Sequence, residues 1–464
     1  MSKVAMRLNA RSTAAGSRAA SRDRPFDIYL AVPLAGCLYA LIVYPLLLSG
    51  CSPADQVCLM APRPENRVVW PLLASAAVVM VVMNWRRIAL SPNIMCLFAY
   101  LAFAGASVAW AYHTESSAVR YVQQVMVVTS IVLPAMIMTG RTDLVRALFL
   151  CFAIASLLSI FFVLGPPPRL AENATPGHTG FFAGKNYLGQ CAAITLLLSF
   201  NEMRYRGVRR VFGAIVGAVA VGLLVLSNSK TGAALVVLTP ALAGIAILGR
   251  RMFGFSPVVL PVAILAIYTV MTFLTSIDVY RLSYYMYGES TFTGRKFIWE
   301  FAQYEISMRP WLGWGYQSFW LVPNSPSAEA KGFVKAMPNA HSGYYDSLLE
   351  MGRFGFVLLI AYLTMTLHAC QRMIDRDPGR AWCVLSLVVF VLIGNALETT
   401  FMRGFEFLWI LFLFLTAEIG RQWVWARAEA PARANVRMRS AVTRSPYRRP
   451  SGGRFGHQAG VRSQ

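Results

Sequence analysis

Twelve long apolar runs divide this chain, and each is about as long as a helix that crosses a lipid bilayer, which needs roughly 20 apolar residues. The backbone in lipid must satisfy its own hydrogen bonds, and these uniformly apolar runs are too long for barrel strands. We therefore predict an all-α, polytopic integral membrane protein with about 12 transmembrane helices. The runs lie at about 26–50, 68–84, 90–112, 120–139, 147–165, 184–200, 211–227, 233–249, 257–275, 343–369, 381–400 and 407–420.

The overall composition excludes a soluble protein built from several globular domains. Of the 464 residues, 56% are hydrophobic and only 14% are charged, whereas soluble domains carry about 25% charged residues. The net charge of +22 could suggest nucleic-acid binding, but 16 of the 43 Lys and Arg residues lie in the terminal stretches 1–24 and 421–464. We therefore attribute much of the basic excess to membrane topology and predict no nucleic-acid partner.

The Lys and Arg residues of the short loops predict how the chain is oriented, because cytoplasmic loops carry an excess of these residues. With a cytoplasmic N-terminus, 29 of the 43 basic residues fall on that side. We expect both termini in the cytoplasm and a disordered C-terminal tail drawn to the anionic inner leaflet. The predicted segments are a basic tail at 1–25, nine helices in 26–275, an external loop at 276–342, three helices in 343–420 and a basic tail at 421–464.

Two of the eight cysteines, Cys51 and Cys58, share one short polar loop. The predicted orientation places this loop in an oxidising compartment, where disulfides form. We therefore predict a disulfide between them. No group of Cys and His residues has metal-ligand spacing, so the sequence predicts no metal site.

Charged and polar residues gather at the predicted outer ends of the spans. A charge near the hydrocarbon boundary is costly unless it is paired or functional. Several cations that face one another would form an anion-binding site. The candidates are Lys185, Asn186, Lys230, Arg295, His341, Arg353, Glu398 and Arg403.

The long external loop contains two further patterns. Residues 293–310 carry apolar side chains at helical spacing and end at a proline, which predicts an amphipathic helix on the outer membrane surface. The next ten residues include Trp311 and Trp314. These aromatic side chains form either an interfacial belt or a platform on which sugar rings stack.

His341 stands between the long loop and the next span. A lone histidine is more often structural than catalytic, but at this position it can titrate near neutral pH and also meet a lipid-borne substrate. Both interpretations stay open. Glu398 and Asp346 are the alternative proton acceptors.

Three sequence blocks occur in order: GFFAGKNYLG from Gly180, SNSKTG from Ser227, and a long block from Thr293 that contains His341 and, eleven positions later, Gly352. With the span pattern, these blocks resemble the bacterial O-antigen ligase and polymerase superfamily (Wzy_C type), and within it the exopolysaccharide polymerases of the ExoQ kind. Members of that superfamily are metal-independent, GT-C-like glycosyltransferases. They use undecaprenyl-diphosphate-linked oligosaccharides at the periplasmic face of the inner membrane.

The resemblance implies that Arg295 and Lys230 contact the diphosphate and that His341 activates the acceptor hydroxyl, without a cofactor. It also implies a lipid-linked oligosaccharide substrate, contact with membrane lipids and a chain-length-regulating co-polymerase as partner. Lys185 and Arg353 are expected to add to the diphosphate site. The residues expected to contact the glycan are Asn186, Trp311, Trp314, Tyr344, Glu398 and Arg403.

Two residues depart from the family pattern. Lys230 stands where relatives usually have arginine, and lysine provides a point charge in place of a bidentate fork. Trp299 replaces the leucine common four positions after the ligase arginine, which favours a polymerase.

Two other functions stay open beside the polymerase. An O-antigen ligase would transfer a finished glycan to lipid A-core. A transporter would need ionisable groups near the bilayer midplane and pseudo-symmetric halves. The polar residues gather at the outer face and the sequence has no internal repeat, so we predict a polysaccharide polymerase.

Overall fold

A computed structural model of the chain describes residues 28–51, 55, 58, 61, 63–138, 142–165, 177–278, 280–281, 284–285 and 294–442. The chain divides into two units, residues 1–424 and 425–464. All regular structure in the described residues is helical, which confirms the predicted fold class. The predicted tail at 1–25 lies outside the described residues.

Ten described helical segments are long and apolar enough to cross a membrane, as expected for a polytopic membrane protein. Two predicted spans are not among them: α12 has only 17 residues, and α9 contains the buried polar residues Gln190, Asn201 and Glu202. The first span combines η1 (Ile28–Leu30), α2 (Ala31–Leu38), the π-helix η2 (Tyr39–Val43) and α3 (Tyr44–Leu48). The other long helices are α5 (Asn66–Met83), α6 (Pro92–Ser107), α7 (Thr114–Ile137), α8 (Leu144–Leu164), α9 (Lys185–Met203), α10 (Val208–Ser227), α11 (Lys230–Phe253), α12 (Val259–Thr275), α14 (Arg295–Met308), α15 (Gly343–Arg376), α16 (Pro378–Leu397) and α17 (Phe407–Val442). Short turns of helix are η3 (Trp85–Arg87), η4 (Val108–Trp110), η6 (Pro326–Glu329) and η7 (Gly332–Ala336).

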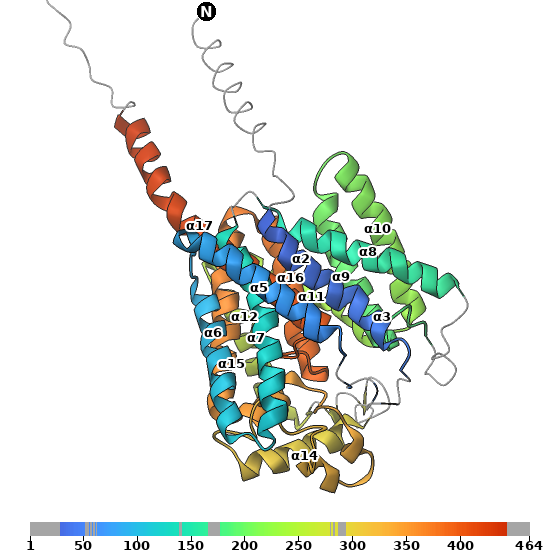
Figure 1. Ribbon diagram of the computed structural model, residues 1–464. Helices are drawn as coiled ribbons and strands as arrows, with labels where there is room; N and C mark the ends of the chain where they lie inside the picture. The colour runs from blue at the N-terminus through green and yellow to red at the C-terminus, as the bar shows by residue number, and fades with distance from the viewer. Residues whose placement is uncertain are drawn as a thin grey trace, which may run out of the picture. The chain divides into compact units, whose positions relative to one another are not determined.

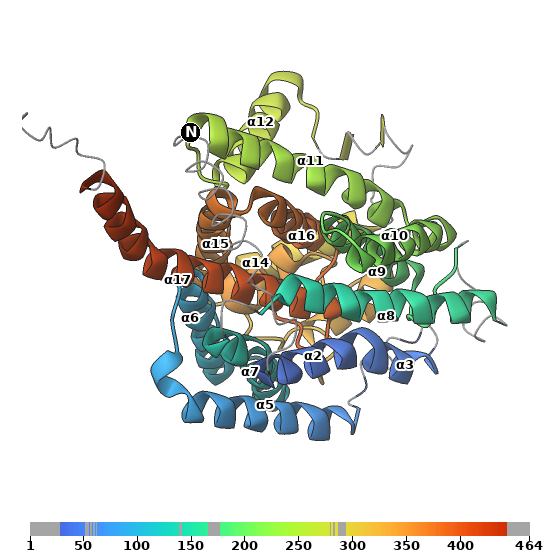
Figure 2. The ribbon, with the colours of Figure 1, turned by 90° about the horizontal axis from the view of Figure 1, so that it is seen from above.

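The core of the first unit is a bundle in which residues 407–421 of α17 are buried. Figure 2 shows this part of α17 between α9, α10 and α11 on one side and α2, α5 and α7 on the other. Helix α9 packs against α8, α10 and α11. Helix α14 lies across one end of the bundle, at the bottom of Figure 1, and we call this end the α14 end.

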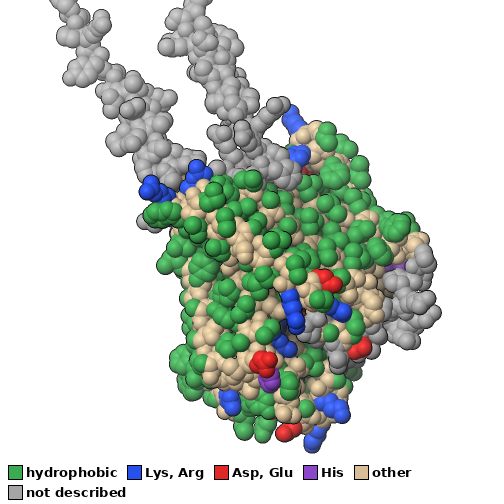
Figure 3. Space-filling view, in the orientation of Figure 1, with side chains coloured by type: hydrophobic (Ala, Val, Ile, Leu, Met, Phe, Trp, Pro, Cys, Tyr) green, Lys and Arg blue, Asp and Glu red, His purple; other side chains and the backbone are tan. Residues whose placement is uncertain are grey.

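The side surface of the bundle is largely apolar. Figure 3 shows hydrophobic side chains over most of one face, with charged side chains at the upper edge and in the lower half toward α14. A surface of this kind is suited to lipid, because apolar side chains meet the hydrocarbon and charges stay near its boundaries.

The predicted amphipathic helix is α14 (Arg295–Met308). One of its faces, with Ile298, Trp299, Ala302 and Glu305, is buried, and the helix packs on α15. Phe297, which the apolar pattern placed on the same stripe, is 51% exposed. The helix therefore packs on protein along much of the face that the sequence analysis assigned to the membrane surface.

The end of the chain differs from the predicted segments, because α17 (Phe407–Val442) continues past residue 420 into the predicted disordered tail. Residues 421–442 are rich in alanine and arginine, which are strong helix formers. The prediction of disorder, which rested on the basic charge, was therefore wrong for residues 421–442. Residues 443–464 lie outside the described part of the chain.

Helix α15 is interrupted at Gly352, whose φ of 61° is left-handed. The break frees the carbonyl groups of Leu349 and Glu350, which accept hydrogen bonds from the backbone N–H groups of Trp314 (2.9 Å) and Gly315 (2.7 Å). A Cβ at Gly352 would overlap the Trp311 carbonyl. Glycine is therefore needed here both for its backbone angle and for the close approach of the loop after α14.

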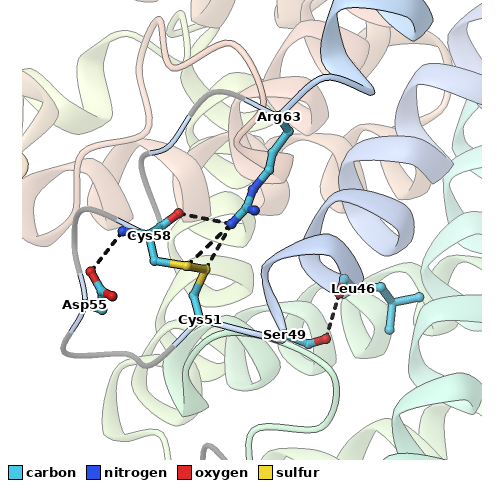
Figure 4. The surroundings of a disulfide bond; sticks show 6 residues. All are labelled: Leu46, Ser49, Cys51, Asp55, Cys58 and Arg63. Carbon is cyan, nitrogen blue, oxygen red and sulfur yellow. Dashed lines mark hydrogen bonds between the residues drawn. A yellow bond between two sulfur atoms is a disulfide. The ribbon is translucent and has the colours of Figure 1, made fainter.

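A disulfide joins Cys51 and Cys58, the pair that the sequence analysis selected, with 5.7 Å between their Cα atoms. The Arg63 guanidinium points at the bridge and donates to the Cys58 carbonyl oxygen at 3.0 Å (Figure 4). The remaining six cysteines are free. The disulfide and the Arg63 hydrogen bond together tie residues 51, 58 and 63 to one another.

A network of buried ion pairs joins five helices at the end of the bundle opposite α14. Asp143, at the start of α8, pairs with Arg209 (3.3 Å) and Arg380 (3.1 Å). Glu202 pairs with Arg209 at 2.6 Å, and Glu418 with Arg380 at 2.9 Å. Burial raises the pKa of Asp143, but Arg380, the Arg146 N–H and Arg209 together hold this pKa below its ordinary value. Asp143 is therefore charged and paired with both arginines.

Asp143→Asn is expected to lower the free energy of unfolding by about 3 kcal/mol, because it leaves buried arginine charge uncompensated while keeping the side-chain oxygen that caps α8. The matched control is Asp375→Asn, which breaks the pair between Arg250 and the half-exposed Asp375 and should cost less than about 1 kcal/mol. Thermal unfolding in detergent measures both. Equal effects of the two variants would contradict a stabilising role for the buried network.

Candidate functional site

Glu398 brings Arg295 and His341 together at the α14 end. Its Oε1 lies 2.8 Å from Nη2 of Arg295, and its Oε2 lies 3.3 Å from Nδ1 of His341. The three side chains are 27%, 20% and 30% exposed, in the order Glu398, Arg295 and His341. The cluster is therefore partly shielded yet open to a substrate, and we call it the Glu398 cluster.

Each member of the Glu398 cluster comes from a different part of the fold. Arg295 is the first residue of α14, and Glu398 directly follows the end of α16. His341 precedes α15 and has a left-handed φ of 48°, an uncommon conformation that costs free energy in a non-glycine residue. Its N–H donates to Asn339 Oδ1 at 2.9 Å, and Trp299 Nε1 donates to the neighbouring Ala340 carbonyl at 3.0 Å. Local hydrogen bonds thus hold the histidine in place.

A second group of charged side chains lies next to the loop that carries His341, because Asp346 accepts a hydrogen bond from the Ala340 N–H at 3.1 Å. Arg403 Nη2 pairs with Glu350 Oε1 at 2.7 Å and with Asp346 Oδ2 at 3.2 Å. Asp346 also accepts hydrogen bonds from Thr399 Oγ1 at 2.6 Å and from Trp320 Nε1 at 2.8 Å. Arg403, a predicted glycan contact, and Asp346, a predicted alternative base, are thus engaged with protein partners and support the loop.

Lys185 and Lys230 stand at the N-termini of two packed helices, α9 and α11. The two motif blocks meet here, because Ser229 Oγ donates to Asn186 Oδ1 at 3.3 Å and a Cβ at Gly189 would overlap Ser229. Helix N-termini carry partial positive charge and favour anions. The structure therefore joins two cationic helix starts that are far apart in sequence.

The predicted aromatic residues differ in their surroundings. Trp314 packs against Phe319, with ring centroids 5.6 Å apart, and donates from Nε1 to the Glu305 carbonyl at 3.1 Å. Trp311 is 55% exposed, and the Arg353 guanidinium lies 5.0 Å from its ring. Trp314 is thus a packing residue, whereas Trp311 and Arg353 form an exposed stacked pair.

Tyr344, the other predicted glycan contact, packs in the interior. Its hydroxyl donates to the Leu392 carbonyl at 2.9 Å, and its ring lies 5.5 Å from that of Phe401. Among the described residues, no group of three or more His, Cys, Asp or Glu side chains has an arrangement that could hold a metal ion.

Sequence reasoning missed Glu406, which lies in the turn before α17. Burial and the nearby Glu398 raise the pKa of Glu406 to about 7, against the opposing charge of Arg403. Glu406 also interacts electrostatically with Tyr187 and Tyr44. Tyr187 is part of the GFFAGKNYLG block, so this motif could have identified Tyr187 as a candidate. Tyr44 lies within an apolar run, which gives no such signal.

The fold and this site together define a polytopic helical membrane protein with a charged, partly open cluster at one end. Residues 214–360 match the family model Wzy_C, described as O-Antigen ligase. The chain is also similar to the exopolysaccharide production protein ExoQ of Rhizobium meliloti (strain 1021), with 25% identity over 299 residues that cover 61% of this chain and 67% of that protein. These matches confirm the resemblance that the sequence motifs indicated.

The match to the family model covers only part of the site. It includes Lys230, Arg295 and His341, whereas Lys185 and Glu398 lie outside it. The assignment of Glu398 to the site therefore rests on its contacts with Arg295 and His341 in the structure and not on the family match.

Proposed function

We propose that this chain is a glycosyltransferase of polysaccharide biosynthesis that joins undecaprenyl-diphosphate-linked oligosaccharide repeat units at the periplasmic face of the bacterial inner membrane. The similarity to the O-antigen ligase model and to ExoQ supports the broad class. The observation that carries the chemical assignment is the Glu398 cluster, which joins a cation and an imidazole through one carboxylate.

In the proposed reaction, an acceptor hydroxyl attacks the anomeric carbon of a lipid-linked glycan. A new C–O bond forms, the C–O bond to the diphosphate breaks, and undecaprenyl diphosphate leaves with the bonding electrons. His341, with its proton on Nδ1, donates to Glu398 Oε2 and leaves Nε2 free to accept the proton of the hydroxyl. Glu398 then orients the imidazole and stabilises its charged form, as the carboxylate of a catalytic triad does. A single displacement of this kind inverts the anomeric centre.

Arg295 is the proposed electrophilic partner of the leaving diphosphate. A lipid diphosphate is already a good leaving group, so fixed cations are enough to stabilise the departing charge. Arg295 Nε is buried without a hydrogen-bond partner among the described residues, and phosphate oxygens are suitable acceptors for such a donor. Lys230 and Lys185, at their helix N-termini, would add positive charge to the same site.

Lys230→Ala is expected to lower polymer formation at least about tenfold, because one charge-assisted contact to the diphosphate is lost. Lys230→Arg should retain most activity, because the charge is kept. Polymer yield at matched protein level in membranes measures both variants. Normal polymer from the alanine variant would mean that Lys230 only extends to the membrane interface.

A ligase that transfers a finished glycan to lipid A-core is the second candidate, and the O-antigen ligase description of the matching family model supports it. The similarity to an exopolysaccharide production protein supports the polymerase. A deletion strain separates the two. The polymerase proposal expects loss of long polysaccharide and accumulation of single lipid-linked repeat units, whereas a ligase would leave long lipid-linked chains unattached to lipid A-core.

A further inference from the structure

Three polar side chains from three separate elements converge beside the Glu398 cluster. Tyr44 belongs to α3, Tyr187 to α9 and Glu406 to the turn before α17. Glu406 interacts electrostatically with both tyrosines, and Tyr187 also interacts with Glu398. We call Tyr44, Tyr187 and Glu406 the tyrosine–glutamate cluster.

Ring packing fixes the positions of both tyrosines. The Tyr44 ring lies 5.5 Å from that of Phe405, and the Tyr187 ring lies 6.3 Å from that of Phe407. Phe405 and Phe407 are the chain neighbours of Glu406. The two tyrosines therefore flank the segment that carries the carboxylate.

The polar atoms of this cluster have no hydrogen-bond partner within the part of the chain that the structure describes: no such bond involves the Tyr44 hydroxyl, the Tyr187 hydroxyl or the Glu406 carboxylate. Fully buried tyrosines of the same bundle are satisfied, since Tyr316 donates to the Met402 carbonyl at 2.6 Å and Tyr362 pairs with Thr416 at 2.7 Å. Tyr187 is 38% exposed, and Tyr44 and Glu406 are half-buried. A ligand can therefore reach them and supply the missing hydrogen bonds.

We propose that the tyrosine–glutamate cluster is a subsite for one sugar ring of the lipid-linked glycan, next to the reacting bond. This inference rests on the proposed function. Aromatic faces suit the C–H surface of a pyranose, and tyrosine hydroxyls and a carboxylate suit its hydroxyl groups. The electrostatic interactions of Tyr187 and Glu406 with Glu398 put this subsite on the side of the proposed catalytic cluster.

Glu406 also makes the subsite sensitive to pH. The groups that face it are Arg403 from its own turn, Glu398 from the end of α16, Tyr187 from α9 and Tyr44 from α3. Its pKa is raised to about 7, so the carboxyl is mainly protonated at pH 6 and mainly charged at pH 8. A charged carboxylate accepts stronger hydrogen bonds from hydroxyl groups than a neutral carboxyl does.

The test measures binding of two probes to the full chain in lipid nanodiscs. One probe is the intact lipid-linked repeat unit extracted from cells that lack this protein, and the other is undecaprenyl diphosphate, which has no sugar. The dissociation constant of undecaprenyl diphosphate divided by that of the lipid-linked repeat unit isolates the contribution of the sugar. At pH 8, Glu406→Gln and Tyr187→Phe should each reduce this ratio about tenfold, the effect of losing one hydrogen bond to a charged or shielded group, with no change in undecaprenyl diphosphate binding.

The matched controls carry the same substitutions elsewhere at the α14 end. Glu115→Gln alters an exposed carboxylate in the first turn of α7, and Tyr304→Phe alters a 60% exposed tyrosine of α14. Both should leave the ratio unchanged. At pH 6 the effect of Glu406→Gln should shrink, because protonated glutamate and glutamine are both neutral.

Two distinct results would overturn the inference or its basis. If the wild-type chain binds neither probe, the proposed function fails. If the wild-type chain binds both probes but Glu406→Gln and Tyr187→Phe keep the wild-type ratio at pH 8, the function stands and the sugar subsite is wrong. Retained undecaprenyl diphosphate binding shows that each variant is folded.

Discussion

Replacing His341 with alanine should slow glycosyl transfer by roughly 10²–10⁴-fold, the range typical for loss of a general base. The imidazole is held at 3.3 Å from Glu398, so the substitution removes the group that we propose as acceptor of the hydroxyl proton. Lipid-linked repeat units should still bind and should accumulate in cells. Turnover of the purified protein and the level of these intermediates measure the effect.

The pH profile separates a base from a structural histidine. A general base acts only in its unprotonated form, so His341→Ala should flatten the acidic limb of the rate profile as well as lower the rate. The matched control is His368→Ala. That histidine lies between Ser256 and Gln371 at the opposite end of the bundle, and its loss should leave both the rate and the profile unchanged. A wild-type profile in His341→Ala would assign the base to another group, with Glu398, the hydrogen-bond partner of His341, as the first candidate.

Arg295→Ala should be the other variant with a large loss, and mainly in kcat. The guanidinium is proposed to stabilise the diphosphate more as it leaves than in the ground state, and such interactions affect turnover more than binding. Loss of a fixed cation at developing charge costs about 10²–10³-fold in comparable sites. Arg295→Lys should recover part of the rate because it restores the charge without the planar fork.

Lys296→Ala is the control for this prediction, since Lys296 follows Arg295 on α14 and pairs only loosely with Glu300, at 3.9 Å. It should retain wild-type turnover. If Arg295→Ala raised KM with kcat unchanged, Arg295 would bind substrate and transition state equally. Its catalytic role would then be withdrawn.

The architecture was largely predictable because lipid imposes a simple rule on sequence. Each apolar run had to become a helix, and the described runs did. The exact number of spans was less predictable, because α9 is buried among other helices and tolerates Gln190 and Glu202. The C-terminal extent of α17 was also not predicted, since a basic, alanine-rich sequence is compatible with either a disordered tail or a helix.

The composition of the site was only partly predictable, because its contacts join residues that are far apart in the chain. Arg295 and Glu398 are separated by 103 residues, and His341 and Glu398 by 57. Sequence motifs identified each residue as a candidate, but only the fold assigns Glu398 to both partners. Arg403 had an equally good pattern, yet the buried Glu350 and Asp346 neutralise it.

The central claim is that this chain itself joins lipid-linked repeat units through the Glu398 cluster. The most direct measurement adds extracted lipid-linked repeat units to the purified chain in nanodiscs, with EDTA present, and follows glycan length by mass spectrometry. The account predicts a ladder of polymers and release of one undecaprenyl diphosphate for each bond formed, with both products lost in His341→Ala. Repeat units that stay single with the folded wild-type chain, whether or not lipid A-core is supplied as acceptor, would contradict it.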